Sequence, residues 1–245
     1  MQSDDTGIRN WCEERLADPA EDLYHAVLFA PPRLRGDVRA LAALFVELEA
    51  IATHFRDLHV ARTKLAWWRD EIERLHAGQP GHPVTRLLAA GESDPSNLLL
   101  SDLVTGMELI LLEGPVTDLA TAQMRSERGL ARFSGVLTRL FDEASIPAES
   151  LVPLGTAAGL VRSLDTADIS DEARHDIAGT ARRMLARESG AARSAPPPLR
   201  VLAALAWNKT SVRVAPGQRR DPRRVFTAWR AARGHLPRNM VRDTA

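Results

Sequence analysis

One set of side chains that could hold a metal ion consists of three carboxylates in the second half of the chain. Asp165, Asp168 and Glu172 are spaced three and four residues apart, so they would share one face of a helix that ran through all of them. Hard cations such as Mg²⁺ take oxygen ligands, which makes that face a candidate cation site. The competing interpretation, which we favour, ends one helix near Asp165 and makes Ser170 the N-cap of the next.

Other common motifs of catalysis and ligand binding are missing from the sequence. His54, His59, His76 and His82 show neither HxxxH nor HExxH spacing, and the single Cys12 can build neither an internal disulfide nor a thiolate metal site within one chain. There is also no GxSxG elbow, GxGxxG loop or GxxxxGK[ST] loop. These observations disfavour a zinc site and the simplest hydrolase, dinucleotide-binding and nucleotide triphosphate-binding classes.

Positive charge is concentrated in one segment, at Arg213, Arg219, Arg220, Arg223 and Arg224. Over the whole chain 32 Lys and Arg residues balance 32 Asp and Glu residues, so the protein as a whole is not drawn to nucleic acid or to an anionic membrane. We interpret the cluster as a solvated tail with loose salt bridges. The alternative is a contact with lipid phosphate groups at the periphery of a membrane, or with a protein partner, whereas nucleic acid is disfavoured.

The elements that must position these residues are helices. Apolar residues recur at three- and four-residue spacings, with breaks at Gly and Pro, and no stretch shows a strand pattern or a repeat. The chain has 245 residues, of which 44% are hydrophobic, which suffices for a large core. We therefore predict an all-α, single-domain irregular helical bundle over residues 1–245, with a basic, less regular segment at about 213–245. The expected helices cover residues 8–28 (broken at Pro19), 36–58, 61–76, 82–90, 98–111, 117–144, 149–165, 170–188, 199–207 and 225–232.

No uncharged apolar stretch reaches the roughly 18 residues of a membrane-spanning helix. The first residues also lack the basic start and apolar run of a signal peptide. We expect a cytoplasmic protein, with any membrane contact at the periphery.

One segment resembles a family signature. Residues 64–72 read Lys-Leu-Ala-Trp-Trp-Arg-Asp-Glu-Ile and are followed by Leu-His-Ala-Gly at 75–78 and His-Pro-Val at 82–84. Together with residues 39–47, Arg-Ala-Leu-Ala-Ala-Leu-Phe-Val-Glu, and 154–162, Leu-Gly-Thr-Ala-Ala-Gly-Leu-Val-Arg, this pattern is similar to the squalene/phytoene synthase family over roughly residues 20–235. The nearest likeness is to a degenerate subgroup that includes respiratory complex I assembly factors.

This resemblance implies an isoprenoid synthase fold, in which Mg²⁺ ions bridge isoprenyl diphosphate to acidic residues on two facing helices. It places the first acidic motif on residues 49–53, where Glu49 is an acid and Thr53 is not. Glu47 lies two positions from Glu49 and points away from it. The second motif falls on residues 162–170, where the family's Asn and paired acids correspond to Arg162, Thr166 and Ser170.

Both acidic motifs are thus eroded, and we predict a non-catalytic protein that keeps the fold as an isoprenoid- or lipid-binding or assembly scaffold. The alternative is an active, magnesium-dependent prenyltransferase that condenses farnesyl or geranylgeranyl diphosphate with altered acids. The candidate cavity or ligand residues are Glu47, Glu49, Thr53, Arg162, Asp165 and Asp168. Of the adjacent Trp67 and Trp68, we expect one in the core and the other at a surface or interface, because neighbouring helical positions diverge by about 100°.

Overall fold

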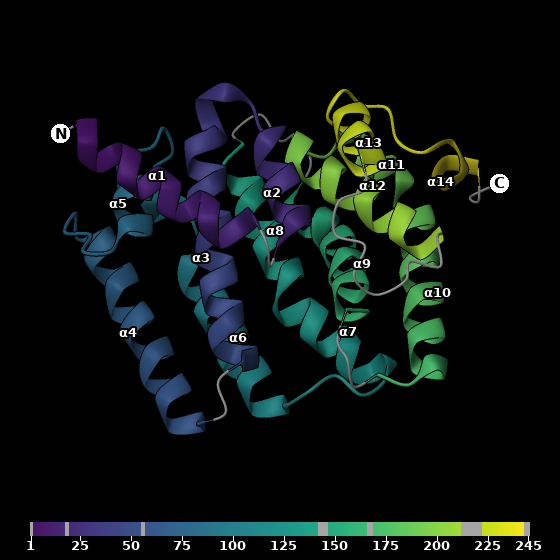
Figure 1. The fold of residues 1–245 in the computed structure, drawn as a ribbon, viewed down its shortest axis with the longest axis horizontal. Helices are drawn as coiled ribbons and strands as arrows, with labels where there is room; N and C mark the ends of the chain where they lie inside the picture. Colours follow the sequence, from purple (N-terminus) through teal and green to yellow (C-terminus); the bar gives the residue numbers. More distant parts are fainter. Residues whose placement is uncertain are drawn as a thin grey trace. The chain divides into compact units, whose positions relative to one another are not determined.

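The computed structural model describes residues 2–17, 20–54, 57–141, 147–165, 169–211 and 222–242. Within these ranges every regular element is a helix and no residue lies in a strand (Figure 1), so the predicted all-α class is confirmed. The chain divides into two compact units, residues 1–114 and residues 115–245. The prediction of a single domain over the whole chain stays a prediction, and each unit is described by itself.

The first unit is arranged around one long helix, α3, which packs against α1, α2, α4, α5 and α6. Its buried side includes Leu41, Leu44 and Leu48, as the helical period of this segment predicts. The helices of this unit are α1 (Gln2–Ala17), α2 (Glu21–Leu28), α3 (Arg35–His54), α4 (Leu58–His76), α5 (Pro83–Ala89) and α6 (Leu100–Glu113), with short 3₁₀ turns at Pro32–Leu34 and Pro95–Asn97.

Capping side chains set where two of these helices begin. The carboxylate of Asp57 accepts hydrogen bonds from the backbone N–H groups of His59 (2.9 Å) and Val60 (3.2 Å), so α4 starts at Leu58, three residues before the expected position. At the start of α5, the His82 ring nitrogen Nδ1 accepts from the N–H of Val84 at 3.2 Å. Gly78, with φ of +73°, follows α4, where a left-handed residue ends the helix at low cost.

A buried carboxylate ties the start of α3 to the loop that follows α5. Asp37 is buried and accepts a hydrogen bond from the Ser93 N–H at 3.1 Å. Burial raises the pKa of Asp37 above its ordinary value, although hydrogen bonds from Ser93 and Glu92 oppose that rise. A Cβ on Gly91 would lie 1.7 Å from the Asp37 carboxylate, so this approach requires glycine.

The second unit is arranged around α9, which packs against α7, α8, α10 and α12. The single helix expected over residues 117–144 is wrong: the chain breaks at Gly129, whose φ of −99° and ψ of −97° are not helical. The short helices α11 and α14 were not predicted. The helices of this unit are α7 (Leu119–Arg128), α8 (Leu130–Arg139), α9 (Val152–Ser163), α10 (Asp171–Arg187), α11 (Ser189–Ser194), α12 (Pro197–Ser211), α13 (Pro222–Ala232) and α14 (Arg238–Arg242), with a 3₁₀ turn at Ala148–Leu151.

Two glycines of α9 allow its backbone to pack directly against α7 and α8. A Cβ on Gly155 would lie 2.4 Å from Ser134 Oγ and 2.7 Å from Ala131 Cα of α8. A Cβ on Gly159 would lie 2.8 Å from the Cβ of Ser126 on α7. Because two of these contacts are with backbone or Cβ atoms, rotation of a side chain cannot relieve them.

We expect Gly155→Ala to lower the free energy of unfolding by about 1–3 kcal/mol, because the added methyl group forces α8 and α9 apart. The matched control is Gly135→Ala on α8, where an added Cβ meets nothing within 4 Å. Alanine is the better helix former, so this control should be neutral or gain up to about 1 kcal/mol. Urea unfolding followed by circular dichroism measures both, and equal effects of the two variants would contradict the close packing.

Candidate functional site

The first candidate cluster lies on α3, and its members already interact with protein groups. Glu47 Oε1 forms an ion pair with Arg15 Nε of α1 at 3.0 Å, so its charge is compensated. Thr53 Oγ1 donates to the backbone carbonyl of Glu49 at 2.7 Å, one turn earlier. Glu49 and Thr53 are both partly exposed. At the position of the first motif this face therefore offers one carboxylate and a hydroxyl that is bonded to its own helix.

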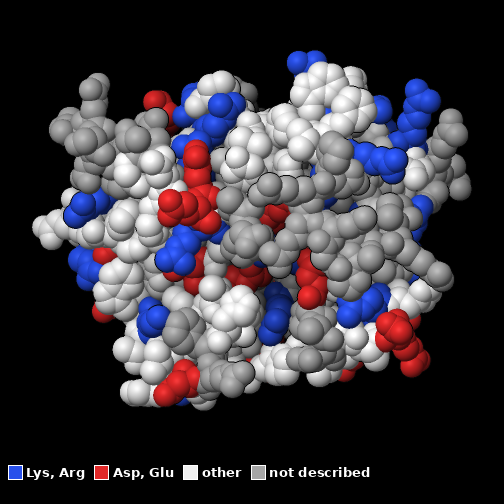
Figure 2. Space-filling view, in the orientation of Figure 1, with Lys and Arg blue, Asp and Glu red and all other residues white. Residues whose placement is uncertain are grey.

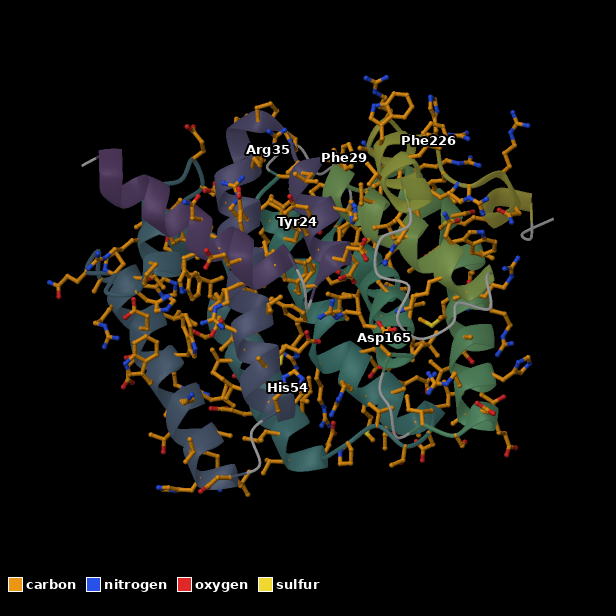
Figure 3. All side chains as sticks on the ribbon, in the orientation of Figure 1. Tyr24, Phe29, Arg35, His54, Asp165 and Phe226 are labelled. Carbon is orange, nitrogen blue, oxygen red and sulfur yellow. The ribbon has the colours of Figure 1, made fainter. Side chains whose placement is uncertain are left out.

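The second candidate cluster lies at the end of α9. Arg162 is partly exposed, and the Asp165 side chain is 71% exposed. Lys209 Nζ of α12 forms an ion pair with Asp165 Oδ2 at 2.5 Å (Figure 3 labels Asp165). The acid that the sequence offered as a magnesium ligand thus has an ammonium group as its partner at the protein surface.

The hypothesis that one helix runs through Asp165, Asp168 and Glu172 is wrong. α9 ends at Ser163, and α10 begins at Asp171 after the N-cap Ser170, whose hydroxyl accepts from the Ala173 N–H at 3.2 Å. This confirms the competing interpretation, in which Asp165 follows the end of one helix and Ser170 caps the next. Asp168, like Thr166, lies outside the described residues.

The described residues at these two places do not form a magnesium site of the kind that the resemblance implies. Mg²⁺ requires several oxygen ligands in near-octahedral geometry, usually with carboxylates that no cation has already neutralised. In the ranges that the structure describes, no three His, Cys, Asp or Glu side chains come together as a set that could hold a metal ion.

The signature segment on α4 contains a buried acid that the sequence analysis did not single out. Glu71 is 0% exposed, and its Oε1 accepts from the N–H groups of Gly81 and His82, both at 2.8 Å, and from the Thr85 hydroxyl. Its Oε2 accepts from Arg74 Nε at 2.9 Å. The sequence did indicate that Glu71 is buried, because residue 71 lies on the apolar side of α4 with Trp68, Ile72 and Leu75.

This set of hydrogen bonds keeps the Glu71 carboxylate ionised. Burial alone raises the pKa of Glu71, but hydrogen bonds from Thr85, His82, Arg74 and Gly81 outweigh it and lower the pKa to about 2. Glu71 therefore joins the last turns of α4 to the first turn of α5. The hydrogen bonds to Gly81, His82 and Thr85 give this carboxylate a structural part at the junction of the two helices.

Aromatic side chains surround the same junction. The His82 ring meets Trp68 edge to face at 4.7 Å between centroids, Trp11 at 5.1 Å and Trp67 at 5.8 Å. Burial lowers the pKa of His82, while the Glu71 carboxylate opposes this and Arg15 adds to it. Trp68 is 4% exposed and Trp67 is 43% exposed, which confirms the expected division between core and surface.

Comparison with known proteins agrees with this fold. The family model described as squalene/phytoene synthase matches residues 16–164, more than half of the chain, and the chain belongs to that family. A solved structure described as "Crystal structure of a dehydrosqualene synthase in complex with ligand" is similar with a TM-score of 0.66 and 11% sequence identity, covering 94% of this chain and 97% of that one. At that identity the likeness concerns the fold alone.

No curated protein sequence matches the chain. The likeness to the subgroup of complex I assembly factors stays a prediction.

We expect Glu71→Gln to cost about 2–4 kcal/mol of stability at pH 7, because the amide leaves Arg74 without its charged partner and places N–H groups against other donors. The folded-state pKa of Glu71 is below its ordinary value of 4.5, so its stabilising contribution is present above that pH and is lost as the pH falls towards about 2. The stability difference between wild type and variant should therefore shrink over this window.

Denaturant unfolding at a series of pH values measures this difference. Glu73→Gln, an exposed change two residues further along α4, is the matched control and should cost less than about 0.5 kcal/mol. A difference between wild type and Glu71→Gln that stayed constant from pH 7 to pH 2.5 would contradict the role of the charge.

Proposed function

We propose that this chain is a non-catalytic member of the squalene/phytoene synthase family, which uses the helical fold to bind an isoprenoid or related lipid or as an assembly scaffold. The observation that carries the proposal is the ion pair between Lys209 and Asp165. It lies at the end of α9, where the resemblance implies the second set of magnesium-binding acids. A lysine at this place satisfies the carboxylate and repels a divalent cation.

The residues of α3 support the same proposal. The resemblance implies two acids four residues apart, a spacing that brings both carboxylates onto one helical face. Here the second position is Thr53, whose hydroxyl bonds to the Glu49 carbonyl, and Glu47 is paired with Arg15. Neither helix supplies the charge that a diphosphate-bound magnesium cluster needs.

The class of ligand is taken from the family. The dehydrosqualene synthase of similar fold is described as a complex with a ligand, and the family's enzymes act on isoprenyl diphosphates. A protein that kept the fold without the metal would retain the apolar part of that recognition. We expect the protein to bind the hydrocarbon chain of an isoprenoid, and we expect this binding to be independent of magnesium.

A second candidate function is an active prenyltransferase with altered acids. It rests on Glu49, which remains on α3 at the first motif and is partly exposed. The two candidates differ in their metal dependence, so one experiment separates them.

We expect no C30 or C40 product when the purified protein is incubated with farnesyl or geranylgeranyl diphosphate and Mg²⁺, because no magnesium cluster activates the diphosphate leaving group. Product extraction and mass spectrometry measure this, with an active family enzyme as positive control. Titration of the same diphosphates by calorimetry should give equal heats in Mg²⁺ and in EDTA. Formation of product, or magnesium-coupled binding that Glu49→Ala abolishes, would establish the prenyltransferase instead.

We expect Thr53→Asp to create a magnesium site that the wild type lacks, because it restores a pair of carboxylates four residues apart with Glu49. Binding of Mn²⁺ as a paramagnetic substitute, followed by electron paramagnetic resonance, should tighten at least about ten-fold. Thr53→Asn is the matched control, with similar volume and no charge. If the wild type already binds Mn²⁺ as tightly as Thr53→Asp, the proposed loss of the metal site is wrong.

A further inference from the structure

The helix α13 is fixed in one orientation by contacts on its inner side. Ala228 and Ala231 are fully buried there. Arg200 of α12 donates to the carbonyl groups of Ala231 at 3.2 Å and Ala232 at 2.9 Å, and Asn208 Nδ2 of α12 donates to Thr227 Oγ1 at 2.8 Å. These bonds determine which side of α13 points outward.

The outward side carries the large apolar residues of this helix. Val225 is 48% exposed, Phe226 is 58% exposed and Trp229 is 39% exposed (Figure 3 labels Phe226 on the outer side of α13). The rings of Phe226 and Trp229 stack at 5.8 Å between centroids. An amphipathic helix of a globular protein normally buries such residues and exposes the small ones, so the usual pattern is reversed here.

Arginines border this apolar face. Arg230 lies over the Phe226 ring at 5.9 Å from its centroid, and Arg233 lies over the Trp229 ring at 4.3 Å. Residues 222–242 contain six arginines and no aspartate or glutamate. On the side shown in Figure 2, white and blue groups adjoin over α13, the yellow helix of Figure 1. We name this surface the α13 face, defined by Val225, Phe226, Trp229, Arg223, Arg230 and Arg233.

We infer that the α13 face docks on an anionic phospholipid bilayer. An interfacial helix lies flat, with aromatic and aliphatic residues among the acyl chains and arginines at the level of the phosphates, and the α13 face has this composition. The 11 residues of α13 are enough for a helix that lies on the surface, and no helix in the described ranges is long and apolar enough to cross a membrane.

Two other occupants of the α13 face are less compatible with its chemistry. A second copy of the chain would bring the same arginines against each other, which is repulsive. Single-stranded nucleic acid binds by stacking its bases on open aromatic faces, whereas Phe226 and Trp229 stack on each other and each has an arginine over its ring. Docking on a bilayer requires only exposed apolar groups and positive charge, and the α13 face offers both.

This inference goes beyond the contact considered for the arginine cluster at residues 213–224, with which the α13 face shares Arg223. Arg213, Arg219 and Arg220 lie outside the described residues, so the α13 face does not rest on them. Its apolar part comes from residues that the sequence analysis had assigned only to a short final helix. The inference is also independent of the proposed function, since an active enzyme and a scaffold could dock in the same way.

The test is flotation of the full-length protein with vesicles of phosphatidylcholine alone and of phosphatidylcholine with about 30% phosphatidylglycerol. We expect binding to the anionic vesicles that weakens as salt rises from low to about 0.3 M. Phe226→Ser with Trp229→Ser should lower the partition coefficient at least about ten-fold. Arg223→Gln with Arg233→Gln should lower it less and reduce its salt dependence.

The matched control is Leu112→Ser on α6, because Leu112 is also a highly exposed apolar residue but has the acidic Glu113 beside it. It should leave vesicle binding unchanged, and circular dichroism with thermal unfolding verifies that each variant folds. The inference is overturned if wild type does not float with the anionic vesicles, or if the serine variants float as well as wild type. If wild type does not bind vesicles but forms concentration-dependent dimers in ultracentrifugation, and the serine variants do not, the α13 face binds a second copy of the chain instead. If wild type binds oligonucleotides but not vesicles, and the serine variants bind neither, the α13 face binds nucleic acid instead.

Discussion

The first unit depends on a carboxylate that has been removed from water. Ionised Glu71 is fully buried, and several kcal/mol of lost hydration must be offset by hydrogen bonds of good geometry. Those bonds come from Arg74 on its own helix and from Gly81, His82 and Thr85 after the turn. The end of α4 and the start of α5 must therefore form together, and Glu71 of the Trp-Trp-Arg-Asp-Glu segment joins them.

A metal site makes the opposite demand on its carboxylates. Acids that await a cation must remain near each other without internal compensation, which is electrostatically unfavourable until the metal binds. In this chain Glu47 is compensated by Arg15, and Asp165 by Lys209. In each of these ion pairs the charge of the carboxylate is balanced by a cationic side chain of the same unit. The chain shares its fold with a dehydrosqualene synthase, while these two acids take part in ordinary ion pairs.

Local patterns in the sequence predicted much of the fold. The helical period gave α3, the residues Ser170, Asp171 and Glu172 gave the start of α10, and the divergence of adjacent positions gave the division between Trp67 and Trp68. The break at Gly129 was not predicted because the apolar period of the sequence continues through it. The ion pairs of Glu47 and Asp165 were not predicted for another reason. Arg15 and Lys209 are 32 and 44 residues from their partners, and no local sequence pattern indicates such a contact. The hydrogen bonds of the buried Glu71 carboxylate also have no local signal, because its partners Gly81, His82 and Thr85 lie 10 to 14 residues further along the chain.

The close approach of α9 to its neighbours also bears on how this chain can tolerate sequence change. At Gly155 and Gly159 any added atom meets a neighbouring helix, so those positions accept almost no alternative residue. Glu49, Thr53 and Asp165 lie at partly or largely exposed positions, where most substitutions change stability little. Mutational tolerance is thus distributed unevenly: the close backbone contacts of α9 resist change, while the exposed candidate positions can be substituted with little loss of stability.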